Sequence, residues 1–179
     1  MKSADEVELL AEGKFLQFVR RGHWEYVTRK GATGVVVVVP LTDQGNVLLV
    51  DQFRPPLQRR VIEFPAGLAG DAEGAAGELL AEAAQRELEE ETGYYAARLE
   101  HIFTGPSSAG LTDEVLDFFV ASGLSRVAKG GGVAGEKIVV HEVPLRDADG
   151  WLSDRVQEGC LVDVRVYTGL YFLARRRGC

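Results

Sequence analysis

The chain has 179 residues, of which 46% are hydrophobic and 26% are charged, and its formal net charge is −7. This length and composition fit one folded domain with a real core, and leave room for a small extra lobe. The acidic balance excludes broad electrostatic binding to nucleic acid, which needs a basic face. The acidic balance does not exclude a small phosphate ligand, because bound divalent cations can reverse the local electrostatic field of a site.

The N-terminal residues are acidic and have no apolar core, so they do not form a signal peptide. The longest apolar run, at residues 35–39, is too short to span a bilayer. The two cysteines, Cys160 and Cys179, cannot build a disulfide framework, although a single bridge stays open. We therefore expect a cytoplasmic protein without a membrane partner.

Strands dominate the first part of the chain. Residues 15–19 and 25–28 are predicted to be two strands joined across 21–23. Val35–Val39 is β-branched at every position and stops at Pro40, which predicts a central strand buried on both faces. The glycine-rich stretch Gly67–Gly77 is expected to be a loop. The other predicted strands cover 47–53, 61–64, 98–103, 114–121 and 136–143.

One prominent helix is predicted over Glu78–Thr92, which is rich in Ala, Glu and Leu and is followed by Gly93 as a C-cap. Two closing helices are expected over Asp147–Gln157 and Asp163–Arg177. A single helix inside a run of strands, followed by two more helices, is typical of an α+β fold.

Carboxylates gather on the first helix. Glu87, Glu90 and Glu91 stand at i, i+3 and i+4, so they share one face. A hard divalent cation such as magnesium, which takes oxygen ligands, would relieve the repulsion between them. Arg86 lies four residues before Glu90 and could steady that carboxylate by a charge-assisted hydrogen bond. For the helix taken alone, the alternative is a solvated charged face.

The stretch resembles the Nudix box, which reads Gly, five residues, Glu, seven residues, then Arg-Glu-aliphatic-any-Glu-Glu-any-Gly-apolar. From Glu78 to Tyr94 the fit is complete. The leading glycine would fall on Ala72, so its equivalent is expected at Gly67, with a five-residue insertion before the helix. Surface loops tolerate such insertions.

The resemblance implies an α/β/α sandwich with a mixed β-sheet, preceded by a small N-terminal β segment. It extends to the branch that hydrolyses ADP-ribose and ADP-sugars, whose members form homodimers by exchanging that segment. Residues 1–33 are then the exchanged segment and 34–179 the catalytic domain. The stretches that resemble this branch are Glu12–Phe15, Trp24–Glu25, Gln52–Pro56, Glu63–Leu68 and Val162–Tyr167.

The resemblance also implies a role for each residue of a metal site. Glu87 and Glu91, with the backbone carbonyl of Ala66, would hold magnesium, for which manganese could substitute. Glu90 would bind the metal or orient the other groups. Arg86 and Glu90 are assigned to the catalytic machinery.

For the substrate, the resemblance assigns Arg54 to the diphosphate and Glu63 to the substrate site. Phe15 and Trp24 would sandwich the adenine, and Glu25 would hydrogen-bond its edge. The family usually has Trp in place of Phe15, which keeps the stacking but loses an N–H donor. Taken singly, the two aromatic residues would more often lie in a core or an interface.

The loop from Gly105 to Glu114 is expected to supply the general base that activates water. The family's acidic residue aligns with Glu114, and Asp113 is the fallback; a solvated turn is the alternative for this loop. ADP-ribose hydrolases typically carry proline where this chain has Ala109. Hydrolysis of another nucleotide sugar, such as GDP-mannose, therefore stays open.

Other motifs give little support to different chemistry. The three histidines lack metal-ligand spacing, and no nucleophile–histidine pattern is present. Gly130–Gly132 lacks the Lys-Ser/Thr ending of a P-loop and is expected to be a flexible turn. The sequence therefore predicts a magnesium-dependent hydrolase that converts ADP-ribose to AMP and ribose 5-phosphate. A non-catalytic nucleotide-sugar sensor on the same scaffold is the second hypothesis.

Overall fold

The strand β4 (Gly34–Pro40) lies at the centre of the computed structural model, which describes residues 6–70, 77–133 and 137–176. Its side chains alternate between two cores. Val35, Val37 and Val39 face one hydrophobic cluster, whereas Val36 and Val38 face another. All five are buried. The prediction of a central strand buried on both faces is therefore confirmed.

The remaining elements of the described residues follow in chain order. The strands are β1 (Val7–Glu12), β2 (Leu16–Arg21), β3 (Trp24–Arg29), β5 (Asn46–Arg54), β6 (Arg59–Glu63), β7 (Ala66–Ala69), β8 (Tyr94–Pro106), β9 (Val115–Arg126), β10 (Val139–Pro144) and β11 (Leu161–Val162). The helices are α1 (Leu80–Thr92), α2 (Ala148–Gln157) and α3 (Val164–Arg176), with short 3-10 turns η1 (Pro55–Leu57) and η2 (Leu145–Asp147).

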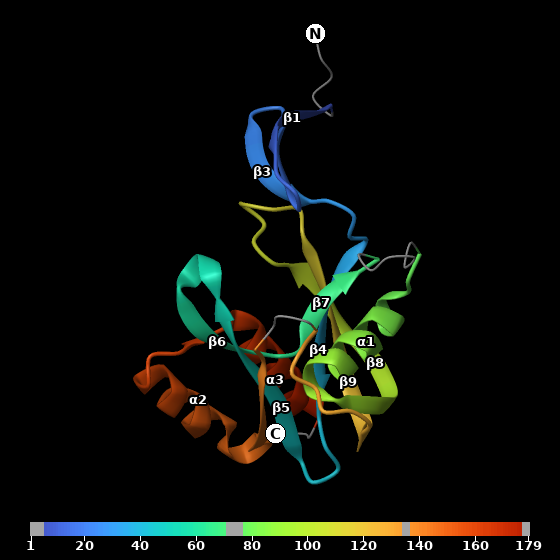
Figure 1. Cartoon of the computed structure of the whole chain (residues 1–179), viewed down its shortest axis with the longest axis vertical. Coiled ribbons are helices and arrows are strands. Elements are labelled where there is room, and N and C mark those ends of the chain that lie inside the picture. Colours follow the sequence, from blue (N-terminus) through green and yellow to red (C-terminus); the bar gives the residue numbers. More distant parts are fainter. Residues whose placement is uncertain (1–5, 71–76, 134–136, 177–179) are drawn as a thin grey trace.

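Two four-stranded sheets form the body of the molecule, in the orders β7-β4-β9-β8 and β10-β5-β6-β11. Both are mixed, because β4 pairs with β9 and β6 pairs with β11 in parallel while the other pairs are antiparallel. Helix α1 covers one face of the first sheet, and α2 and α3 contribute to the core on its other side (Figure 1). This is the α+β sandwich that the sequence predicts.

Helix α1 begins and ends for local reasons. The side chain of Glu82 accepts a hydrogen bond from the backbone N–H of Leu79 at 3.1 Å, which satisfies one donor at the helix start. Gly93 ends the helix in the left-handed conformation, with φ of 77°. Ala83, Ala84 and Leu88 lie on the buried face. The predicted helix is thus present, although it starts two residues later than expected.

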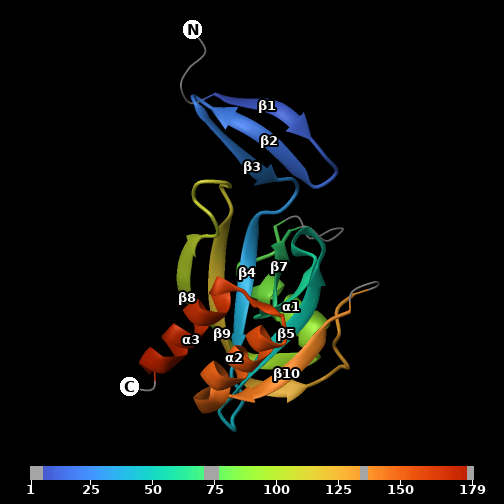
Figure 2. The same ribbon diagram turned by 90° about the vertical axis from the view of Figure 1, so that its left-hand side faces the viewer.

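The strands β1, β2 and β3 form a separate antiparallel sheet. Figure 2 shows this sheet projecting from the end of the molecule, above β4 and the loop between β8 and β9. The contact with the body includes a hydrogen bond from the backbone N–H of Val27 to the carbonyl of Leu111, at 2.8 Å. The sheet therefore extends onto the loop that was expected to carry the general base.

Two expectations, one about a loop and one about a strand, need correction. The first residues of the predicted loop, 67–69, form the strand β7 together with Ala66, because β4 offers a free edge with which they pair from Val37↔Ala66 to Gly34↔Ala69. Residues 71–76 of that predicted loop, including Ala72, lie outside the described residues. The strand predicted from residue 136 starts at Val139. No helix in the described ranges is long and apolar enough to cross a bilayer.

Candidate active site

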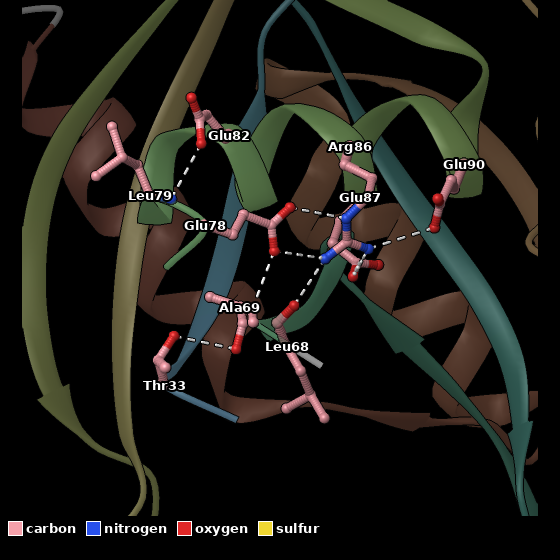
Figure 3. A network of polar contacts seen from close by, with 10 residues as sticks. Thr33, Leu68, Ala69, Glu78, Leu79, Glu82, Arg86, Glu87 and Glu90 are labelled. Carbon is pink, nitrogen blue, oxygen red and sulfur yellow. Dashed lines mark hydrogen bonds and ion pairs between the residues drawn. The ribbon is translucent and has the colours of Figure 1, made fainter. Parts of the chain in front are cut away.

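Arg86 organises the face of α1 that carries the carboxylates (Figure 3). Its Nε and Nη2 donate to Glu78 at 3.0 and 3.2 Å, and Nη1 donates to Glu87 at 2.6 Å. Nη2 also donates to the carbonyl of Leu68 at 2.8 Å. The hydrogen bonds to Glu78 are the main reason that the pKa of Arg86 is raised. The contact with Glu90 is longer, 3.5 Å, so Arg86 steadies Glu87 more directly than Glu90.

The carboxylate of Glu87 occupies the space that a side chain at position 67 would fill. A Cβ built on Gly67 would lie only 2.0–2.3 Å from the carboxylate atoms of Glu87, so a side chain at this position would displace that carboxylate. Gly67 therefore leaves room for the carboxylate of Glu87, and its place as the leading glycine of the box stays a prediction. The same contact brings Glu87 next to the backbone that follows Ala66.

The oxygen donors expected to hold a metal have the chemistry that magnesium prefers. Glu87, Glu90 and Glu91 lie together on α1, and Glu91 is buried at 6% exposure. Among the described residues, however, no three acidic, His or Cys side chains converge closely enough to hold a metal ion. Glu87 and Glu90 each contact Arg86 through one carboxylate oxygen, so metal binding requires these carboxylates to shift toward one another.

Beside β7 lies a cavity of about 510 Å³. The volume is within the range of small-molecule sites. Its wall contains the guanidinium groups of Arg29, Arg54 and Arg165, which come from β3, β5 and α3. Residues 66–68 of β7 also line the cavity. A guanidinium group can donate two parallel hydrogen bonds to two oxygens of one phosphate. A wall with three arginines is therefore suited to a diphosphate.

Glu63 lies behind these arginines, with only 2% of its surface exposed. Its Oε2 accepts hydrogen bonds from Arg54 and Gln52, both at 2.9 Å, and its Oε1 accepts one from Arg165 at 2.8 Å. Burial raises the pKa of Glu63, while Arg54 and Arg165 oppose that rise. Glu63 therefore holds two cavity arginines in place, rather than facing the cavity itself.

Glu114 lies at the cavity wall, where Arg29 holds it. Both hydrogen bonds from Arg29, at 2.9 and 3.1 Å, go to Oε1. Asp113, the fallback, lines a separate hollow together with Trp24. Of the two candidates for the general base, Glu114 is the one that faces the arginine-lined cavity.

Phe15 and Trp24 do not lie together within one chain. They sit at opposite ends of the β2–β3 hairpin, since Lys30 donates its N–H to the carbonyl of Phe15 and Trp24 pairs with Arg21. Six residues along the strand, at a rise of about 3.3 Å per residue, separate them by roughly 20 Å. Both are exposed, at 64% and 53%. They can sandwich one base only if each comes from a different copy of the chain.

Sequence reasoning gave no role to two of the cavity arginines. Arg165 follows Asp163, which accepts a hydrogen bond from it at 2.6 Å. Burial works to raise the pKa of Asp163, but the hydrogen bond and charge of Arg165 outweigh it and lower that pKa. The charged Asp-x-Arg start of the last helix was the available signal for Arg165. Arg29 had none, because its proximity to Glu114 arises from a contact across 85 residues.

Comparisons with known proteins place these features in a family. Residues 32–155 match the NUDIX domain. The chain is 40% identical over 116 residues to an ADP-ribose pyrophosphatase of Bacillus subtilis (strain 168), covering 64% of this chain and 60% of that protein. It is 32% identical over 123 residues to a methanol dehydrogenase activator of Bacillus methanolicus, covering 68% of this chain and 64% of the relative.

The chain thus spans less than two thirds of the length of these two curated relatives. Among solved structures, a protein described as an ADP compounds hydrolase superposes with a TM-score of 0.71. That match covers 95% of this chain and 90% of the other at 20% sequence identity, so it supports the fold alone.

Proposed function

The chain belongs to the NUDIX domain family, and we propose that it hydrolyses the diphosphate bond of a nucleoside diphosphate sugar, with ADP-ribose as the first substrate to test. One observation carries this proposal. The acidic face of α1 and a cavity walled by Arg29, Arg54 and Arg165 meet at the close contact between Glu87 and Gly67. A metal-binding face beside a phosphate-binding wall is the arrangement that diphosphate hydrolysis requires.

In this proposal Glu87, Glu90, Glu91 and the carbonyl of Ala66 would hold magnesium, or manganese in its place. The cations would supply positive charge that polarises the diphosphate and lowers the pKa of the attacking water. Arg54 would bind phosphate oxygens, and Glu63 would keep that arginine oriented. Arg86 would orient Glu87, to which it already donates a hydrogen bond.

Glu114 would take the proton from the attacking water. Arg29 occupies Oε1 of this carboxylate, so Oε2 is the atom that would accept the proton. With ADP-ribose the products would be AMP and ribose 5-phosphate.

The adenine would be held by Phe15 and Trp24 of two different subunits, with Glu25 at its edge. We therefore include in the proposal a homodimer in which residues 1–33 are exchanged. Exposed apolar side chains on the small sheet support an interface there. They are Val7, Leu9, Leu10, Phe15, Leu16, Phe18 and Trp24. We further propose a reducing, cytoplasmic setting, in which Cys160 stays a free thiol.

The test is chromatographic detection of AMP released from ADP-ribose, with magnesium and with EDTA, beside GDP-mannose and a nucleoside triphosphate. We expect magnesium-dependent AMP release that is fastest with ADP-ribose. Activity on GDP-mannose alone would support the metal site and contradict the assignment of Phe15 and Trp24 to adenine binding. Binding of ADP-ribose without turnover on any substrate would support a sensor instead.

A further inference from the structure

The segment Val127–Gly132, here called the docking loop, is attached to the C-terminal end of α1. The backbone N–H groups of Gly131 and Gly132 donate to the carbonyls of Glu91 and Glu90, at 2.8 and 3.0 Å. Val127 and Ala128 both donate to the carbonyl of Gly93, at 2.9 and 3.1 Å. The expectation that Gly130–Gly132 is merely a flexible turn is therefore wrong for this part of the loop.

The docking loop completes the C-cap of α1. An α-helix leaves its last four carbonyls without a partner inside the helix. In α1 the carbonyl of Glu89 accepts the N–H of Gly93 at 2.8 Å, and the docking loop supplies donors for Glu90 and Glu91. Three of these four carbonyls are thus satisfied, two of them by a segment about forty residues away in the sequence.

This end of α1 needs such help for electrostatic reasons. Four of its last six residues are glutamates, and its last turn contains no basic residue. Negative side chains are unfavourable at a helix C-terminus, where the helix dipole is also negative, and carboxylates spaced at i+3 and i+4 repel each other. Backbone N–H groups of the docking loop bring partial positive charge to the end of the helix without adding a side chain.

Glycine is required for the contact from both sides. A Cβ on Gly93 would lie 2.8 Å from the nitrogen of Gly130, and a Cβ on Gly130 would lie 2.6 Å from the nitrogen of Gly93. Both residues also have positive φ, 77° and 70°. The two backbones therefore lie too close together for any side chain at either position.

We propose that the docking loop positions the metal-binding carboxylates. By holding the last turn of α1 in helical form, it keeps Glu90 and Glu91 at their spacing from Glu87 while no cation offsets their repulsion. The inference rests on the proposed function, because it concerns the affinity of that site for its metal. The docking loop itself contributes no ligand.

The first test is the variant Gly130→Ala, with Gly159→Ala as the matched control. Gly159 has φ of 94° and open space around its Cβ position, so it imposes backbone strain without a clash. For Gly130→Ala we expect the Mn²⁺ dissociation constant, measured by EPR without substrate, to rise roughly tenfold, the lower end for loss of a group that orients metal ligands. The control should bind Mn²⁺ as the wild type does.

The rate of hydrolysis should show the same loss of metal affinity. Metal binding pulls the last turn back into helical form, so saturating Mg²⁺ should restore the kcat of Gly130→Ala, while the Mg²⁺ concentration for half-maximal rate rises. An irreversible loss of folded protein would instead lower the apparent kcat at every Mg²⁺ concentration. Gly93→Ala introduces a clash with the docking loop from the helix side. Because both substitutions break the same contact, the double variant should bind Mn²⁺ no more weakly than either single variant.

A second measurement uses the wild-type protein and does not depend on the variants folding. Coupling is reciprocal, so metal must strengthen loop docking if docking strengthens metal binding. We expect Mg²⁺ to slow hydrogen exchange of the Gly131 and Gly132 amides. Two outcomes would overturn the positioning role and leave the proposed function standing. One is amide exchange that Mg²⁺ does not change in a protein that binds Mn²⁺, and the other is wild-type Mn²⁺ affinity in folded Gly130→Ala. A wild type that neither binds Mn²⁺ nor hydrolyses any substrate would overturn the proposed function.

Discussion

Two buried glutamates, Glu63 and Glu91, differ in what surrounds them. Glu63 is enclosed by Arg54, Arg165 and Gln52, and its charge is balanced within the protein. Glu91 lies on α1 in the acidic group that the proposed function assigns to metal. Burial of an ionised carboxylate is costly unless a cation compensates it. At the residue scale, arginines compensate the negative charge of Glu63, and a bound metal would help to compensate that of Glu91.

Replacing Glu91 with glutamine tests this assignment. Glu91→Gln keeps the size of the side chain but removes the charge, so we expect kcat for ADP-ribose to fall by at least about a hundredfold, the upper range for groups that merely support a metal site. Thermal unfolding should show that the variant is folded. Glu89→Gln, on the same helix but outside the proposed ligand set, is the control and should stay active. A Glu91→Gln enzyme that retains most of its rate would remove Glu91 from the metal site.

At the scale of elements, α3 matters because it carries Arg165 to the cavity while packing on the core. Its buried residues Val166, Gly169 and Leu173 lie along one face. A Cβ on Gly169 would lie 2.9 Å from Cγ2 of Val39 and closer still to the ring of Phe64. The absence of a side chain at this position therefore sets how closely α3 approaches β4 and Phe64, the residue that follows β6.

Two helical glycines give a matched pair of variants. Gly169→Ala should lower the free energy of unfolding by about 1–3 kcal/mol, because the added methyl overpacks the core. Gly150→Ala, in α2, has open space around the new methyl. It should raise the free energy of unfolding by roughly 0.5–1 kcal/mol through helix propensity. Urea denaturation of both variants measures the difference, and equal stabilities would show that α3 is not tightly packed at Gly169.

At the scale of the whole molecule, the small β1–β2–β3 sheet stands out because it and its connecting turns carry seven exposed large hydrophobic side chains. Phe15 and Trp24 occupy its opposite ends, so a shared adenine site requires a second copy. The salt bridge from Arg29 to Glu114 ties the same sheet to the cavity. An interface on this sheet would thus affect both the base-binding residues and the proposed general base.

Light scattering coupled to size exclusion tests the proposed dimer. We expect twice the chain mass of 19.5 kDa. Leu9→Glu, at an exposed position of β1, should shift the protein toward the monomer and raise KM for ADP-ribose, because charge on an apolar interface is costly. Val156→Glu, equally exposed at 51% but on α2, should change neither. A wild type that runs as a monomer at all concentrations would exclude the shared adenine site.

The sequence by itself determined the elements whose signals are local. A β-branched run predicts β4, and an alanine- and glutamate-rich segment ending at Gly93 predicts α1. Residue spacing alone places Glu87, Glu90 and Glu91 on one face, since helical periodicity needs no tertiary contact. The resemblance to a known motif then supplied the chemistry and pointed to Arg54 and Glu114.

Only the tertiary structure decided what depends on pairing across the chain. It made a strand of residues 66–69 because β4 had a free edge, and it brought Arg29 and Arg165 to the cavity from opposite ends of the sequence. It also attached the docking loop to α1, where glycines that read locally as a flexible turn serve as a close backbone contact. Local propensity cannot foresee these features, because each arises from groups that meet only when distant segments fold together.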